Sequence, residues 1–458
     1  MKFSVLSTLA LASMATAFEQ AFTDAMMESN KMLNLKNYKT NSRNHQKSNG
    51  AFAAAKYANT PSTKCVNGKA GEYSCKNIDL QNHLTHDSMG SKTREGNDIW
   101  GWTSSDGREF AIVGQTDGTA FVEVKAGGQL KYVGRLPTQT VNAIWRDIKV
   151  IGNHAYIGSE ARNHGVQIFD LRKLLSVGSS PKTFSIKTDL TALYSGVGSS
   201  HNIVANEETN TIFIVGATAN AGCTGSNGGL VMVDVKDPAK PTLLGCAGQD
   251  GYVHDAQCVI YRGVDKNFQG REICFGYNED TLTIYDVTNK KKPAVVSRVT
   301  YEGFNGKGAY THQGWNIDSD FKYLLLDDEL DEVKRGKDGK DTHTTTYIFD
   351  ISSLANPVWT GEYKSPVRSI DHNQYVIDGI SYQANYGSGL RVVDARGVAS
   401  DPTGGSMKEL ANFDCYPEDD ANPTAEFYGA WSVYPWFESG TVIMNCIERG
   451  LFALKVNK

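Results

Sequence analysis

The chain has 458 residues, of which 40% are hydrophobic and 21% are charged, and its formal net charge at pH 7 is −5. These values are ordinary for a globular protein, and they provide no basic surface of the kind that nucleic-acid binding requires. No apolar run approaches the roughly 20 residues that a membrane helix needs. We therefore expect neither a nucleic-acid partner nor a membrane span.

The first 17 residues are typical of a secretory signal peptide. Lys2 supplies the positive charge, residues 5–12 are apolar, and Ala15-Thr16-Ala17 has the small-x-small pattern of a cleavage site. The sequence thus predicts a secreted, extracellular protein, with an uncleaved anchor as the alternative. Residues 18–63 are rich in Asn, Lys, Ser and Ala and lack a strand pattern, which indicates a flexible N-terminal arm or a propeptide.

From residue 64 to the end, a pattern of four short strands recurs. It is clearest in residues 254–301, where four segments rich in Val, Ile and Tyr are separated by turn residues. The pattern begins seven times, at intervals of 45 to 60 residues, at Trp100, Trp145, His201, His254, His312, His372 and Trp431. Such a repeat predicts an all-β domain over residues 64–458, a seven-bladed β-propeller of four-stranded antiparallel blades.

The last repeat lacks a fourth strand, because the chain ends soon after the segment Leu451–Val456. An N-terminal segment, Asn77–Leu84, has the character of an outer strand. We expect this segment to complete the last blade and to close the ring, which would leave no open sheet edge.

Eight cysteines accompany the predicted signal peptide, as in proteins of oxidising compartments. The most local pairing joins Cys65 to Cys75, Cys223 to Cys246, Cys258 to Cys274, and Cys415 to Cys446. The alternative is that some of them are buried free thiols.

Several ordered motifs resemble one protein family. CVNGKAGEYSCKNIDL, HNIVANEETN, DGYVHDAQCVIY, YTHQGW and GAWSVYP are similar to segments of the choice-of-anchor B family of secreted or surface proteins, which are built from LVIVD repeats. The third strands carry that motif as LVMVD at 230–234, LTIYD at 282–286 and LRVVD at 390–394. The resemblance covers about residues 65–456 and implies an extracellular propeller without an established reaction.

Four histidines occupy the same place in four successive repeats, just before the predicted innermost strand. They are His201, His254, His312 and His372, followed by Asn202, Asp255, Gln313 and Asn373. Innermost strands line the channel of a propeller, so these side chains would converge near its axis and could hold a divalent transition metal such as zinc, copper or iron. The alternative is that each imidazole hydrogen bonds to the backbone of the adjacent blade.

Three tryptophans, Trp100, Trp315 and Trp431, are expected near the same channel mouth. Their rings could stack on a carbohydrate or on a side chain of a protein ligand, or could pack between blades. The acidic run that begins Asp327-Asp328-Glu329 offers hard oxygen ligands for calcium, but it lacks the spacing of a loop site and could instead be a solvated charged loop.

A capping role in turns is expected for the Asp that ends several third strands, since Asp accepts hydrogen bonds from backbone N–H groups two residues on. These residues are Asp170, Asp234, Asp286, Asp350 and Asp394.

No standard catalytic motif for a nucleophilic serine, a phosphate-binding loop or a zinc protease occurs. Three functions remain. The first is a secreted binding protein whose ligand sits at the channel mouth, and the second is a metal-dependent extracellular oxidoreductase or hydrolase that uses the histidines. The third is a storage or structural coat protein without a ligand.

Overall fold

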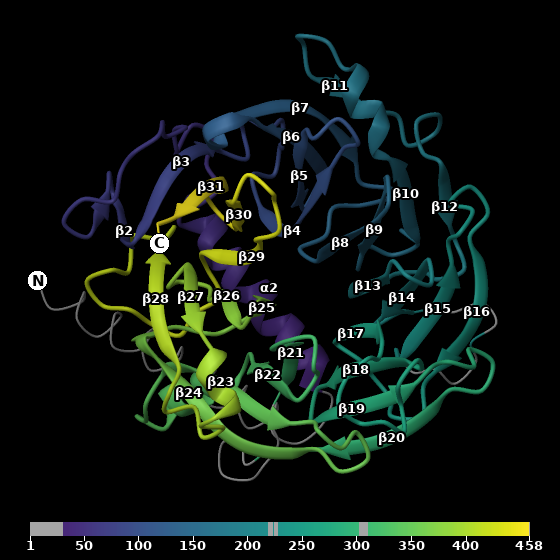
Figure 1. The fold of residues 1–458 in the computed structure, drawn as a ribbon. Helices are drawn as coiled ribbons and strands as arrows, with labels where there is room; N and C mark the ends of the chain where they lie inside the picture. Colours follow the sequence, from purple (N-terminus) through teal and green to yellow (C-terminus); the bar gives the residue numbers. More distant parts are fainter. Residues whose placement is uncertain (1–30, 219–222, 224–227, 302–309, 458) are drawn as a thin grey trace, which may run out of the picture.

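The computed structural model describes residues 31–218, 223, 228–301 and 310–457. The expected signal peptide and residues 18–30 of the expected arm lie outside this part of the chain. The described strands form seven sheets arranged in a ring around a central channel (Figure 1). The predicted seven-bladed propeller is confirmed.

The first strands of the blades line the channel, and those of neighbouring blades contact one another around the whole ring. Blade one contains β4 (Gly96–Thr103), β5 (Glu109–Gln115), β6 (Gly118–Val124) and β7 (Leu130–Pro137), with β11 (Lys182–Thr183) parallel to β7. Blade two contains β8 (Arg146–Ile151), β9 (His154–Ser159), β10 (Val166–Asp170) and β12 (Ala192–Tyr194). Blade three contains β13 (Asn202–Asn206), β14 (Thr211–Val215), β15 (Leu230–Asp234) and β16 (Thr242–Ala247).

The remaining blades follow the same antiparallel order. Blade four contains β17 (Asp255–Ile260), β18 (Glu272–Asn278), β19 (Thr281–Asp286) and β20 (Ala294–Val299). Blade five contains β21 (Thr311–Asn316), β22 (Tyr323–Asp328), β23 (His343–Asp350) and β24 (Val358–Arg368). Blade six contains β25 (Asn373–Ile377), β26 (Ile380–Ala384), β27 (Leu390–Asp394) and β28 (Lys408–Phe413), extended by β2 (Tyr73–Lys76) and β1 (Lys69–Ala70). Blade seven contains β29 (Ala430–Tyr434), β30 (Thr441–Cys446), β31 (Gly450–Val456) and β3 (Ile78–Leu84).

The N-terminal strand β3 closes the ring. It pairs antiparallel with β31, the last strand of the chain, and Leu80 lies opposite Leu454. Both leucines are fully buried. The expected completion of the last blade by residues 77–84 is confirmed, and β1 and β2 add a second connection, through β28, between the N-terminal segment and blade six.

The second and third strands of the blades have continuous apolar sequences, because both faces of these strands are covered by neighbouring blades. In β14, for example, every residue from Thr211 to Val215 is buried. The aspartates that end third strands act as turn caps, as expected. Each accepts a backbone hydrogen bond two residues on, in the cases of Asp170, Asp234, Asp286, Asp350 and Asp394.

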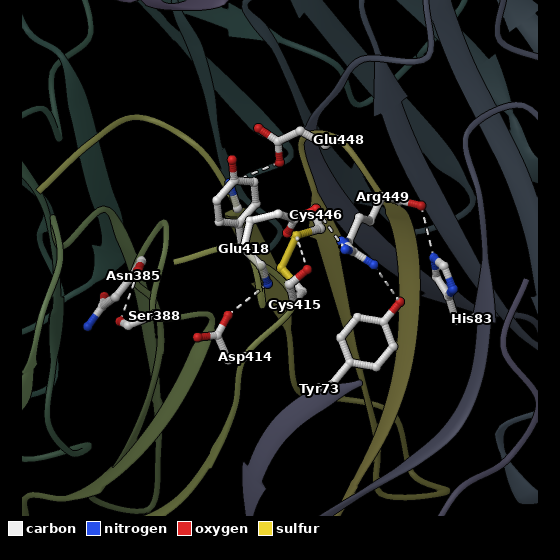
Figure 2. The surroundings of a disulfide bond; sticks show 12 residues. Tyr73, His83, Asn385, Ser388, Asp414, Cys415, Glu418, Cys446, Glu448 and Arg449 are labelled. Atoms are coloured by element: carbon white, nitrogen blue, oxygen red, sulfur yellow. Dashed lines mark hydrogen bonds and ion pairs between the residues drawn. A yellow bond between two sulfur atoms is a disulfide. The ribbon is translucent and has the colours of Figure 1, made fainter. Parts of the chain in front are cut away.

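Four disulfides join the cysteines in the most local pairing, Cys65–Cys75, Cys223–Cys246, Cys258–Cys274 and Cys415–Cys446. Two of these bonds have clear positions in the ring. Cys258 and Cys274 are directly opposite on β17 and β18. Cys415 and Cys446 connect the end of blade six with blade seven (Figure 2).

The described helices lie outside the blades. Two are α-helices, α2 (Lys31–Ser48) and α3 (Asp331–Lys337), and three are short 3₁₀ turns, η1 (Ala126–Gly128), η2 (Leu171–Ser176) and η4 (Arg396–Ala399). The helix α2 crosses the centre of the ring (Figure 1). Residues 31–48 of the segment expected to be a flexible arm or a propeptide form this helix, and its basic side chains form ion pairs with carboxylates at the channel.

Candidate metal centre at the channel mouth

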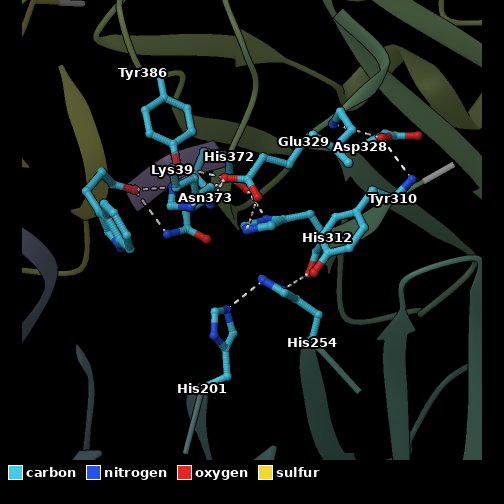
Figure 3. Close-up of polar contacts among 12 residues, drawn as sticks. Lys39, His201, His254, Tyr310, His312, Asp328, Glu329, His372, Asn373 and Tyr386 are labelled. Carbon is cyan, nitrogen blue, oxygen red and sulfur yellow. Dashed lines mark hydrogen bonds and ion pairs between the residues drawn. The ribbon is translucent and has the colours of Figure 1, made fainter. Parts of the chain in front are cut away.

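The four histidines converge at the channel, at the starts of β13, β17, β21 and β25. All four side chains are buried, and the ring centroids of successive histidines are 4.1 to 4.5 Å apart. Figure 3 shows them side by side with Glu329 and Lys39. Gly216 packs closely against His201. A Cβ at this position would lie 2.5 Å from the Cβ of His201, and the backbone φ of 58° independently favours glycine.

Three imidazoles bind the backbone of the next blade. Nδ1 of His254 donates to the carbonyl of His312 at 2.9 Å, and Nδ1 of His312 donates to the carbonyl of His372 at 2.8 Å. Nδ1 of His372 donates to the carbonyl of Trp431 at 2.6 Å. The inter-blade hydrogen bond that the sequence suggested is therefore present. It also places the proton of each neutral ring on Nδ1 and leaves the Nε2 lone pair available, as in metal-binding histidines.

His201 reaches the same tautomer through a carboxylate. Its Nδ1 donates to Oε1 of Glu160 at 2.5 Å, because a carboxylate can only accept. Its Nε2 lies 2.7 Å from Nε2 of His254. Two nitrogen lone pairs at this distance repel each other unless both nitrogens share a proton or bind a metal ion.

Glu329 adds a carboxylate to the imidazoles. One of its oxygens forms a group with one ring nitrogen each of His254 and His312, and these three atoms lie within 4.8 Å of one another. Oε1 of Glu329 is 3.4 Å from Nε2 of His372, and Oε2 is 3.6 Å from Nε2 of His312. Within the described residues, Oε2 is buried and has no hydrogen-bond partner.

Burial controls the charge of these groups. It lowers the pKa of all four histidines, and that of His254, His312 and His372 falls well below the usual value of 6.5. Burial alone would raise the pKa of Glu329, but the charge and the hydrogen bond of Lys39 outweigh it and hold the pKa below its usual value. The site thus combines neutral imidazoles with an ionised carboxylate at neutral pH.

A lysine of the helix α2 enters this site. Nζ of Lys39 donates a hydrogen bond to Oε1 of Glu329, and the ammonium lies 5.2 to 5.8 Å from the ring centroids of Tyr386, Phe427 and Trp431. Tyr386 also donates to Oε1 of Glu329, at 2.7 Å. One turn earlier, Nζ of Lys36 is 2.7 Å from Oε1 of Glu160. The helix therefore brings one cation to each carboxylate beside the histidines.

The polar residues that follow the histidines have other contacts. Asn373 donates to the carbonyl of Trp431 at 3.0 Å, and Gln313 accepts from the backbone N–H of Gln374 at 3.0 Å. Burial raises the pKa of Asp255 to about 7, while Lys149 and the side chain of Asn202 act in the opposite direction. These residues connect neighbouring blades rather than surround the Nε2 atoms.

The three tryptophans do not share one location. Trp431 packs against His372, with ring centroids 5.1 Å apart. Trp100 and Trp315 instead pack together with Trp436 and Tyr375 in an aromatic cluster further along the innermost strands. Of the three, only Trp431 therefore adjoins the histidines.

The acidic run is buried, so the interpretation as a solvated loop is wrong. Asp327, Asp328 and Glu329 are at most 1% exposed. Asp328 is fully used by the fold, because Oδ1 accepts from the backbone N–H groups of Tyr310 and Leu330 and Oδ2 accepts from the hydroxyl of Tyr301. Glu329 faces the histidines and Asp327 faces Gln374, so the three carboxylates do not form one calcium site.

Sequence reasoning identified the histidines but missed Glu160, Glu329 as a partner of the histidines, and Lys39. One signal was present for the helix. Lys36, Lys39, Arg43 and Lys47 are spaced by three or four residues, so they share one helical face. Arg43 and Lys47 both pair with Glu95, at 3.2 and 2.8 Å.

Comparison with known proteins agrees with the repeat pattern. The LVIVD repeat model matches residues 144–171 and 223–247. No curated protein matches the chain significantly. Among solved structures, the Cps50 (Swd1) β-propeller domain of Myceliophteria thermophila is similar, with 9% identity and a TM-score of 0.45 over 76% of this chain and 94% of that one.

The chain is thus a seven-bladed β-propeller with LVIVD repeats. Its four disulfides are typical of proteins from an oxidising compartment. Among the described helices, none is long and apolar enough to cross a membrane.

Proposed function

We propose that this protein is a secreted member of the choice-of-anchor B type of LVIVD propellers and that its function is to bind a divalent transition metal at the channel axis. The ligands would be Nε2 atoms of His201, His254 and His312 with a carboxylate oxygen of Glu329. His372, 3.4 Å from that carboxylate, lies within reach as a further ligand.

The observation that carries the proposal is the 2.7 Å separation of Nε2 in His201 and His254. Both Nδ1 atoms are already donors, so in the neutral rings both Nε2 atoms carry lone pairs. A proton between them would make one ring an imidazolium, which burial strongly disfavours. Two nitrogens that bind one metal at 2.0–2.1 Å each lie about 2.9 Å apart at a right angle and about 3.3 Å apart in a tetrahedron, so a small separation of the two rings would admit a shared metal ion.

The donor set narrows the identity of the metal. Imidazole nitrogens favour zinc, copper, iron and nickel over calcium and magnesium, and a single carboxylate is compatible with each of the first three. The hydrogen bonds at Nδ1 would fix the ring orientations, because each acceptor belongs to the rigid backbone of a blade or to Glu160. We therefore expect zinc, copper or iron.

Metal binding is favoured here over catalysis. A metal in this site would supply a Lewis acid or a redox centre, and a hydrolase or oxidoreductase would also need access for a substrate. The helix α2 lies at the site and its Lys39 contacts Glu329. An enzyme would therefore require this helix to move.

A second function, recognition of a protein at the same mouth, is favoured by the contacts of α2. Lysines of this helix pair with Glu160 and Glu329, and the Lys39 ammonium adjoins three aromatic rings. A basic helical segment of a partner would find the same carboxylates and rings if α2 were displaced. These contacts favour a cationic peptide over a carbohydrate as the ligand.

Titration of the metal-free protein with Zn²⁺ and Cu²⁺, followed by calorimetry, tests the first function. We expect one tight site per chain, and a loss of affinity of at least about 100-fold in the His254→Ala/His312→Ala variant. His83→Ala is the matched control, since His83 is also buried but lies in blade seven, where its Nε2 donates to the carbonyl of Arg449 at 2.9 Å. Equal affinity in all three proteins would refute the assignment.

A further inference from the structure

A second group of carboxylates lies behind the histidines. Asp327 lies near the end of β22, Asp331 and Glu332 begin α3, and Asp371 precedes β25. All four are at most 1% exposed. Ligand oxygens of Asp331, Glu332 and Asp371 lie within 4.8 Å of one another, and the side chains of Asp327 and Asp371 are in contact.

Some oxygens of these carboxylates accept hydrogen bonds from the protein, and the others do not. Asp327 accepts from the Gln374 amide at 2.7 Å through Oδ1, and Glu332 accepts from the backbone N–H of Thr345 at 2.9 Å through Oε1. Asp331 accepts from the Tyr347 hydroxyl at 2.6 Å through Oδ2.

The other oxygens of the cluster are buried without a hydrogen-bond partner among the described residues. They are Oδ2 of Asp327, Oδ1 of Asp331, Oε2 of Glu332, and both Oδ1 and Oδ2 of Asp371. Asp371 in particular accepts from no N–H or O–H donor outside the cluster, although it is 1% exposed. Its side chain contacts the carboxyl of Asp327, and the carboxyls of Asp331 and Glu332 contact each other in the same way, so each pair needs either a shared proton or a cation between its oxygens.

One guanidinium compensates part of the charge. Nη2 of Arg335 lies 2.9 Å from Oδ2 of Asp331, the oxygen that Tyr347 also contacts. This ion pair therefore leaves Oδ1 of Asp331, Oε2 of Glu332 and the oxygens of Asp371 without a donor from outside the cluster. A cation placed between them would contact only oxygens that have no other role.

We propose that Asp327, Asp331, Glu332 and Asp371 bind a calcium ion. Hard oxygen ligands select calcium, magnesium or manganese over zinc and copper. Calcium takes six to eight oxygens and accepts bidentate carboxylates, which suits the two unused oxygens of Asp371, whereas magnesium keeps several waters and needs octahedral geometry. Glu332 also lines a surface cleft of about 540 Å³, so the cluster adjoins solvent.

This calcium site is distinct from the metal centre at the histidines and does not depend on it. The acidic run is divided between the two, since Glu329 faces His312 while Asp327, Asp331 and Glu332 face Asp371. Asp328, between them in sequence, is saturated by protein donors. Bound calcium would hold the turn from β22 into α3 to the start of β25.

The test is calorimetric titration of the full-length, chelator-treated protein with CaCl₂ and, separately, with MgCl₂, together with thermal unfolding at each endpoint. We expect one calcium per chain, an affinity for calcium at least about tenfold above that for magnesium, and a calcium-dependent rise in Tm. Absence of calcium binding, or equal affinity for magnesium, would overturn the calcium assignment.

Two substitutions locate the ion. Asp371→Asn keeps the shape of the side chain and removes one charge, so it should weaken calcium binding at least about tenfold without lowering the Tm of the metal-free protein. Glu332→Gln should do the same and serves if the first variant does not fold. His254→Ala should retain calcium binding. Unchanged calcium affinity in both carboxylate variants would place the ion elsewhere and contradict the proposal.

Discussion

Nε2 of His201 and Nε2 of His254 lie 2.7 Å apart, while the Nδ1 atom of each ring is already committed as a donor. The two acceptors differ, because His201 donates to the Glu160 carboxylate and His254 donates to the backbone of blade five. Both contacts direct a lone pair toward the channel axis.

Replacing Lys39 by Met should strengthen the binding of a transition metal. The Lys39 ammonium donates to Oε1 of Glu329 and so competes with any cation that uses this carboxylate. We expect the Kd for Zn²⁺ to fall about tenfold, equivalent to about 1.4 kcal/mol. A competition titration with a chromophoric chelator measures the change.

The control for this variant is Lys47→Met. Lys47 lies on the same helix but pairs with Glu95, and its side chain is 45% exposed. Its replacement should leave the Kd unchanged. The competition model fails if Lys39→Met binds zinc no better than the wild type.

Glu160→Gln should weaken the same site by acting through His201. The carboxylate holds the Nδ1 proton of His201, and an amide can accept this proton from only one orientation of its side chain. Loss of such an outer partner typically lowers metal affinity about 10- to 100-fold. Glu160→Asp, which retains the charge, should recover part of the affinity, and equal weakening in both variants would argue for a purely steric effect.

Leu80→Ala should destabilise the closure of the ring. Leu80 is fully buried on β3 opposite Leu454 on β31, so truncation leaves a cavity at the seam between the two ends of the chain. We expect a loss of about 2–5 kcal/mol in the free energy of unfolding, measured by urea denaturation with the disulfides intact. Leu410→Ala on β28, where Leu410 is 38% exposed, should cost less than about 1 kcal/mol. Similar losses for the two variants would contradict the role of β3.

Asp414→Asn should change the pH dependence of stability. Burial raises the pKa of Asp414 to about 8, although its Oδ1 accepts from the backbone N–H of Tyr416 at 2.7 Å (Figure 2). Between about pH 4 and pH 8 the folded protein therefore keeps a proton that the unfolded chain has lost. Asp414 thus reduces the free energy of unfolding as pH rises through this window, by up to about 1.4 kcal/mol per pH unit.

Asn does not titrate in this range. The free energy of unfolding of the variant should therefore rise relative to that of the wild type as the pH is raised from 4.5 to 8. Urea unfolding at the two pH values measures the difference. Asp394→Asn is the control, because hydrogen bonding and ion pairing with Arg396 lower the pKa of Asp394. The stability that Asp394 contributes is present above the pKa that Asp394 has in the unfolded chain, and it is lost only as the pH falls. The Asp394→Asn variant should therefore not gain stability relative to the wild type toward pH 8.

The blades were predictable because each repeat buries the same strands. Segments such as Leu230–Asp234 are apolar and end in an Asp that caps the following turn, and both features are local in sequence. The closure by β3 was predictable from the strand missing in the last repeat. The histidines could be assigned to the axis because they hold one position in four successive repeats.

The carboxylates of the site could not be assigned in the same way. Glu160 and Glu329 follow the second strands of blades two and five, and only the closure of the ring brings them to the histidines. The acidic run has the composition of a solvated loop, yet Tyr301, Tyr310 and Thr345 supply donors from other segments that allow its burial. Such donors are distant in sequence and leave no local pattern.

The metal content of the protein, isolated without chelators or a histidine tag, tests the central claim most directly. Elemental analysis should find close to one zinc, copper or iron per chain in the wild type and in His83→Ala, and little in His254→Ala/His312→Ala. An absence of these metals in the wild type, with no uptake of zinc or copper by the chelator-treated protein, would contradict the account. The histidines would then serve only the hydrogen bonds between blades.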